Sequence, residues 1–274
     1  MSYTNAHSRK EDREIYRLAR GFLGQLGEPE LTPTVIESYL IAPVADRPRK
    51  LNGLYQRLIS SAQNANMKVK VVSGSIGGIK NLGLVLYGFS PKLTASTYGA
   101  DSEKLLKAVI KILKPTGKIR QTPRSIWPQY CTTVLAAADF LSHFKSASDF
   151  YAWVNFFDND PRARPGLPLI LSREVKGIGF ALACDFLKEL GYANFGKPDV
   201  HIRDIFMAAG LCADDTSDYE LFKILCRVAD SAGVSPYTAD KVFWLIGSGL
   251  FYNHRHLGNN GRIAGTKRAF LGMF

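Results

Sequence analysis

Apolar and polar positions alternate along most of the chain with the period of an α-helix. Six apolar residues between Ile15 and Leu26 recur at the i, i+3, i+4 and i+7 spacing of a buried helix face. The same period returns from Leu105 to Leu113, with lysines largely on the opposite side. Further helices are predicted at 134–144, 150–157, 181–190 and 240–251. The patch Lys68–Val72 alone resembles a strand, and it can equally end a helix, so the sequence predicts an all-α fold.

Proline and glycine clusters separate these helices, and the chain has 274 residues, of which 46% are hydrophobic. This length suits one large domain or two small ones around a shared cleft. We expect a central helical bundle at 47–196 and a second helical lobe formed by 1–46 with 197–274. No apolar run approaches the roughly 18 residues of a membrane span, and the chain starts with polar residues. We therefore expect neither a membrane protein nor a secretory signal, and a bacterial cytoplasmic, nucleoid-associated location.

Positive charge is concentrated in one part of the chain. The segment Arg47–Ala138 holds 15 of the 35 Lys+Arg residues and only two of the 24 acids. The stretch from Asn253 onward adds Arg255, Arg262, Lys267 and Arg268 without any acid. Surface lysines can serve solubility alone, but a segment this one-sided usually faces a polyanion. A nucleic-acid backbone is the expected partner, with binding that weakens as salt rises.

Metal and nucleotide chemistry are not expected. The four cysteines are far apart and form no C-x-x-C pair, which is typical of reduced, mostly buried thiols and not of zinc or iron–sulfur ligands. The glycine-rich stretch 74–80 lacks the G-K-[ST] ending of a phosphate-binding loop. The sequence therefore predicts no cofactor and no metal.

The most informative stretch runs from Leu169 to Phe206. An apolar helix is predicted to end near Arg173, and a second one to start at Phe180, with Gly177-Ile178-Gly179 as a tight turn between them. The pair spans about 169–190. Amides at the start of the second helix, together with the helix dipole, favour a bound phosphate. After that helix follows Pro198-Asp199-Val200-His201.

The turn, the helix with its small residue Ala183, and the later Pro-Asp-Val-His sequence resemble the helix-hairpin-helix DNA glycosylases. That superfamily includes endonuclease III, the 8-oxoguanine glycosylases and 3-methyladenine glycosylase II. The resemblance implies a two-lobed helix-hairpin-helix fold with the active site in the interdomain cleft. It also implies a monomer that binds double-stranded DNA containing a modified or damaged base, without the iron–sulfur motif that follows the aspartate in endonuclease III.

The resemblance further implies roles for individual residues. Asp199 becomes the catalytic carboxylate, although an aspartate there can also simply cap the next helix. Lys176, Gly177, Ile178 and Gly179 become the DNA-phosphate site. Because Leu58–Asn64 resembles the L-x-S-x-Q segment of endonuclease III, Gln63 and Asn64 become the residues that fill the base gap. A plain helix C-cap explains them equally well.

The base pocket needs aromatic walls, for which the candidates are Trp127, Gln129 and Tyr130, or Phe251, Tyr252 and His254. Core packing explains the aromatic residues at least as well.

Members of the superfamily that also nick the strand carry a lysine two positions after the second glycine of the turn. Here that position is Ala181, which cannot form a Schiff base. The expectation is a monofunctional base-excision enzyme that leaves an abasic site. Two alternatives stay open, namely a glycosylase/lyase that uses Lys176 or Lys197, and a catalytically silent DNA-binding or damage-sensing protein. An oxidised purine, an alkylated purine and a bulky modified pyrimidine of phage DNA are all open as the excised base, and so are repair and defence as the role.

Overall fold

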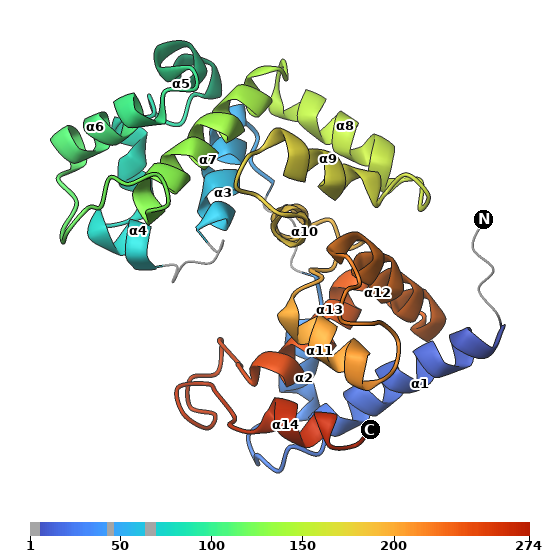
Figure 1. The fold of residues 1–274 in the computed structure, drawn as a ribbon. Coiled ribbons are helices and arrows are strands. Elements are labelled where there is room, and N and C mark those ends of the chain that lie inside the picture. Colours follow the sequence, from blue (N-terminus) through green and yellow to red (C-terminus); the bar gives the residue numbers. More distant parts are fainter. Residues whose placement is uncertain (1–5, 43–46, 64–69) are drawn as a thin grey trace. The chain divides into compact units, whose positions relative to one another are not determined.

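The computed structural model describes residues 6–42, 47–63 and 70–274, and over these residues the chain is helical (Figure 1). The first helices are α1 (Ala6–Leu23), α2 (Pro33–Leu40), α3 (Leu51–Ala62), α4 (Lys70–Ser75), the 3-10 helix η1 (Ile79–Leu84), α5 (Pro91–Tyr98), α6 (Ser102–Leu113) and α7 (Ile126–Ser142). They are followed by α8 (Ala147–Asp158), α9 (Gly166–Glu174), α10 (Phe180–Glu189), α11 (Val200–Ala208), α12 (Asp218–Ala232), α13 (Pro236–Ser248) and α14 (Thr266–Leu271).

The predicted all-α fold is confirmed, because the described residues form only isolated β-bridges at 250–262 and 259–262 and no strand. The described part of the strand-like patch, residues 70–72, lies in α4. None of the described helices combines the length and the apolar character needed to cross a membrane.

The chain forms two compact units. Unit 1 comprises Met1–Ala45 with Leu187–Phe274, and unit 2 comprises Asp46–Phe186, in both cases over the described residues. The division at 186–187 falls inside α10, so the second helix of the predicted hairpin begins in unit 2 and ends in unit 1.

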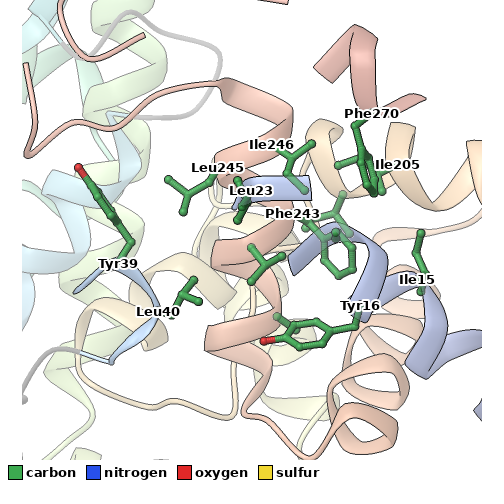
Figure 2. Close-up of a cluster of buried hydrophobic side chains, with 14 of the residues drawn as sticks. Ile15, Tyr16, Leu23, Tyr39, Leu40, Ile205, Phe243, Leu245, Ile246 and Phe270 are labelled. Atoms are coloured by element: carbon green, nitrogen blue, oxygen red, sulfur yellow. The ribbon is translucent and has the colours of Figure 1, made fainter. Parts of the chain in front are cut away.

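In unit 1, the two chain ends share one hydrophobic core. Helix α1 packs on α12 and α13, and α13 also packs on α2, α11 and α14. Figure 2 shows Tyr16, Leu23 and Phe270 among the buried side chains around α13. A salt bridge from Arg227 Nε to the fully buried Asp12 Oδ2, 2.6 Å long, ties α12 to α1. Helix α11 is therefore packed on the core of unit 1 through α13.

In unit 2, α7 is the central helix, in contact with α3, α5, α6 and α9. Its buried side chains surround most of the helix, as expected for a helix packed on several sides. Two buried tyrosine hydroxyls donate to backbone carbonyls across this core, from Tyr55 to Val134 at 2.9 Å and from Tyr130 to Ile59 at 2.8 Å. These bonds satisfy polar groups that would otherwise be costly to bury.

Candidate functional site

The predicted hairpin forms in unit 2 with the expected helix ends. Helix α9 ends at Glu174 and α10 begins at Phe180. Val175 and Ile178 are buried, and the Ile178 amide donates to the Val175 carbonyl at 3.0 Å, which closes the turn. The first helical bond of α10 runs from the Ala183 amide to the Gly179 carbonyl at 3.0 Å. The amides just before it therefore lack partners within the helix.

The two glycines of the turn have different reasons to be glycine. Gly177 has a φ of +92°, and a Cβ at this position would lie 2.0 Å from Thr133 Oγ1 on α7. Gly179 has no positive φ, and a Cβ there would have nothing within 4 Å. Lys176, Gly177 and Gly179 are exposed. The fold thus requires Gly177, whereas Gly179 faces open space on the surface of the turn.

Asp199 lies in unit 1 and caps α11. Its Oδ1 accepts hydrogen bonds from the amides of His201 at 2.9 Å and Ile202 at 3.2 Å. The other carboxylate oxygen has no hydrogen-bond partner among the described residues. The capping bonds fix the direction of the partly buried carboxylate while one oxygen stays available for chemistry.

A second carboxylate holds the loop that leads to Asp199. Asp240 of α13 is fully buried, and its Oδ2 accepts from Lys188 Nζ of α10 at 2.7 Å and from the Lys197 amide at 3.1 Å. Its Oδ1 is buried without a partner among the described residues. Gly196 lets the loop come this close, because a Cβ there would lie 2.6 Å from Leu225 Cδ2 and 2.8 Å from the Pro236 carbonyl oxygen. Asp240 therefore joins the loop at Lys197 to α13, and through Lys188 also to α10.

The surroundings of Asp199 and His201 shift the pKa values of both side chains. Burial raises the pKa of Asp199, and the negative charge of Asp240 raises it further, against smaller lowering effects of His201, the Ile202 amide and Lys197. Burial lowers the pKa of His201, with Lys267 and Arg262 acting in the same direction and Asp199 and Asp204 against it. The net direction favours the neutral form of the imidazole.

The His201 ring lies against the end of α13. A Cβ on Gly247 would be 2.4 Å from His201 Cβ, so this close packing depends on glycine. The buried Nδ1 of His201 has no hydrogen-bond partner among the described residues. The first turn of α11 is thereby fixed on α13, next to the loop held by Asp240.

The predicted gap-filling residues lie at the end of α3. Gln63 is 4% exposed, and its Nε2 donates to the Ser60 carbonyl at 3.4 Å, while its Oε1 has no partner among the described residues. Asn64 lies outside the described residues. The Gln63 side chain is folded back on its own helix, so entry into a DNA duplex requires it to rotate outward.

The first set of predicted base-pocket residues lies at the start of α7. Tyr130 is buried in the core with its hydroxyl bonded to Ile59, Trp127 packs edge-on against it with ring centroids 6.2 Å apart, and Gln129 is exposed. Trp127 also lines a groove of about 610 Å³ in unit 2. The basic residues of this groove are Lys118, Arg120 and Arg124. Core packing thus explains the position of Tyr130. Of these three candidates, Trp127 is the one that both packs in the core and lines the basic groove.

The second aromatic set lies in unit 1. Phe251 is fully buried, and the Tyr39 hydroxyl is 2.8 Å from His254 Nδ1. Tyr252 is 43% exposed, and its hydroxyl accepts from Lys241 Nζ at 3.2 Å. The Lys241 ammonium also lies over the rings of Tyr237, Trp244 and Tyr252, at 5.7, 5.2 and 5.1 Å from their centroids. Lys241, Tyr237 and Trp244 belong to the same helix, α13, as Asp240, and Tyr252 follows the end of this helix.

Sequence reasoning missed Asp240, Lys188 and Lys241. Asp240 occupies a position of the apolar stripe of α13, between the buried residues Ala239 and Val242. A carboxylate at such a position is almost never buried without a partner. This break in the helical pattern was the available indication, and it points to a buried partner such as Lys188. Among the described residues, no group of three or more His, Cys, Asp or Glu side chains could hold a metal ion.

Comparisons with known proteins gave one solved structure of note. No family model matches the chain, and no curated protein matches it. The structure is similar to the crystal structure of the Methanocaldococcus jannaschii 8-oxoguanine glycosylase/lyase in complex with 15mer DNA containing 8-oxoguanine. The match has a TM-score of 0.47 and 17% sequence identity, and covers 82% of this chain and 95% of that chain.

Proposed function

We propose that this protein is a DNA N-glycosylase that extrudes a modified or damaged base and hydrolyses its N-glycosidic bond, leaving an abasic site. The proposal depends on the orientation and the pKa of the Asp199 carboxyl group. Its carboxylate is aimed by two amides of α11, keeps one oxygen without a partner among the described residues, and has a raised pKa. It follows the exposed G-I-G turn at the spacing of the helix-hairpin-helix glycosylases.

The chemistry that we assign to Asp199 is electrostatic and proton-accepting. As the bond between C1′ and the base nitrogen breaks, its electron pair leaves with the base, and the sugar develops oxocarbenium character. A fixed carboxylate of opposite charge stabilises that state in a site shielded from water. The same group accepts a proton from the water whose oxygen then bonds to C1′.

We assign binding of the DNA backbone to unit 2. Extrusion of a base costs a few kcal/mol, least for a damaged or weakly paired one, and must be offset by binding. The exposed residues Lys176, Gly177 and Gly179 of the turn are suited to one backbone phosphate. The basic segment Arg47–Ala138 supplies the wider positive surface. Gln63, once rotated outward, and Asn64 are proposed to occupy the gap that the base leaves.

The proposal is tested by base release. The purified protein is incubated with genomic DNAs that carry different modified bases, and the released bases are identified by mass spectrometry. Abasic sites are counted in parallel. We expect wild type to release one class of base, and Asp199→Asn to lose this activity by at least about 100-fold. Asparagine is an equally good helix cap, so the fold is expected to survive the change.

Asp101→Asn is the matched control. Asp101 also caps a helix, accepting from the Lys104 amide at 2.9 Å, but it is exposed at the start of α6 in unit 2. It is expected to keep full activity. If wild type and Asp199→Asn bind DNA equally and both release no base from any of the DNAs, the protein is a silent binder and the proposal is wrong.

A further inference from the structure

A groove of about 470 Å³ lies in unit 1, on the side of α13 where this helix ends. Its wall is formed by the small residues 247–249 at the end of α13, by 262–265, and by the start of α14. Gly249 and Gly265 have positive φ angles of +62° and +77°, and a Cβ on Gly249 would lie 2.5 Å from the Ile263 carbonyl oxygen. The groove thus depends on glycines that let two backbone segments approach closely.

The charge of this groove is positive. Its ionisable lining residues are Arg262, Lys267 and Arg268, and the sequence from Tyr252 to the last residue contains no Asp or Glu. Lys267 is paired with Asp204 of α11, and this negative charge reduces the contribution of Lys267 to the positive potential of the groove. Arg262 is exposed and donates from Nη1 to the Ser248 carbonyl at 3.1 Å, which holds its guanidinium at the groove. Arg268 is also exposed. Two guanidinium groups therefore remain for an anion from solution.

The groove is adjacent to the Asp199 cluster. Gly247 belongs to the groove lining, and the side chain of His201, two residues after Asp199, packs closely against it. Lys267 and Arg262 are close enough to lower the pKa of His201. Lys267 joins α14 directly to α11 through Asp204. An anion in the groove would therefore lie next to the helix that Asp199 caps.

We propose that this groove binds a backbone phosphate of the DNA strand near the target nucleotide. The assignment of DNA as the source of the phosphate rests on the proposed function. Guanidinium groups make paired, charge-assisted hydrogen bonds with phosphate oxygens, and two of them line this one concave site. Such a contact would hold the strand in unit 1, where Asp199 lies, independently of the hairpin in unit 2.

The test compares Arg262→Gln/Arg268→Gln with its parent, both in the Asp199→Asn background so that no chemistry occurs. The ligand is a short duplex containing a stable abasic-site analogue, and Kd is measured from low to moderate salt. We expect Kd at low salt to rise by about tenfold to 100-fold. The slope of log Kd against log salt is expected to fall by roughly one to two, as for one or two lost phosphate contacts.

Arg9→Gln/Lys10→Gln is the control with the same loss of charge. Both side chains are exposed on α1, where Glu11 and Glu14 follow them and mix the signs. This variant is expected to keep the parental slope. Arg268→Gln alone tests the groove without touching the Arg262–Ser248 bond, and it is expected to lower the slope by roughly one.

The outcomes separate the two proposals. If both groove variants keep the affinity and slope of the control, the groove proposal is wrong. It is also wrong if they bind DNA normally but lose binding of inorganic phosphate, since the groove then serves a free anion. If wild type releases no base while the groove variants show the reduced slope, the glycosylase proposal fails and the phosphate site stands.

Discussion

At the scale of single residues, the most consequential side chain is Asp240, because it acts on the candidate catalytic group without being that group. Lys188 Nζ and the Lys197 amide both donate to Asp240 Oδ2, so this carboxylate joins α10 and α13 to the loop that leads to Asp199. Asp240 is therefore a positioning residue, and its negative charge adds to the burial that raises the pKa of Asp199.

The first prediction concerns Asp240→Asn. The pKa of Asp199 is raised partly by the charge of Asp240, so the neutral amide lowers it. If ionised Asp199 is the active form, activity then persists to lower pH, and the acid limb of the pH–activity profile moves toward the ordinary aspartate range. The variant also leaves Lys188 buried without its carboxylate, for which a loss of about 3–5 kcal/mol in the free energy of unfolding is expected. Base release across pH and urea unfolding measure the two effects.

Asp218→Asn is the control for the profile. Asp218 also pairs with a cation, Arg203, at 2.9 Å, but it starts α12 and is half exposed. Its change is expected to leave the acid limb in place. An unmoved acid limb in Asp240→Asn would mean that the pH dependence comes from a group other than Asp199.

Among the structural elements, the hairpin has one glycine that the fold requires, Gly177, and one that the fold does not require, Gly179. Gly177→Ala combines a positive φ with a contact of 2.0 Å to Thr133, so we expect it to destabilise the protein by roughly 1–3 kcal/mol. Gly179→Ala meets nothing in the protein and is expected to leave the melting temperature unchanged. A phosphate held by the turn amides would, however, meet the new methyl group. We therefore expect Gly179→Ala to weaken binding to duplex DNA about tenfold, measured by titration next to thermal unfolding.

A result that would count against this assignment is full DNA affinity in Gly179→Ala. The turn would then be a structural corner only, and DNA contact would have to be sought elsewhere in unit 2.

The hairpin and its helices were predictable because they depend on local patterns. A glycine pair between two apolar periods specifies the turn within a few residues, and an aspartate before an apolar helix predicts its cap. Asp240 was not recognised as the partner of the 196–199 loop, because the approach of a chain segment 43 residues away has no local pattern. The burial of Tyr130 was equally hidden, since an aromatic residue has the same appearance in a core as in a pocket.

For the molecule as a whole, the question is which product the proposed glycosylase would leave in DNA. A strand-nicking glycosylase needs an amine that reaches C1′ and forms a Schiff base. If the resemblance of the turn to the helix-hairpin-helix glycosylases holds, Ala181 stands where the strand-nicking members carry a lysine, and its methyl group offers no amine. Of the nearby lysines, Lys188 is bound to buried Asp240, and Lys197 is held through its amide by the same carboxylate. Lys176 lies in the exposed part of the turn in unit 2.

We therefore predict an unnicked product. After incubation with its substrate DNA, the strand is expected to break only on later treatment with alkali, and borohydride is expected to trap no covalent protein–DNA adduct. Ala181→Lys supplies the missing amine on α10 and is expected to create a trappable adduct, which shows that the assay can detect one. If wild type is trapped instead, Lys176→Ala and Lys197→Ala identify the amine. Loss of trapping in one of them would replace water by that lysine as the nucleophile at C1′, with Asp199 left as the group that stabilises the positive charge developing on the sugar.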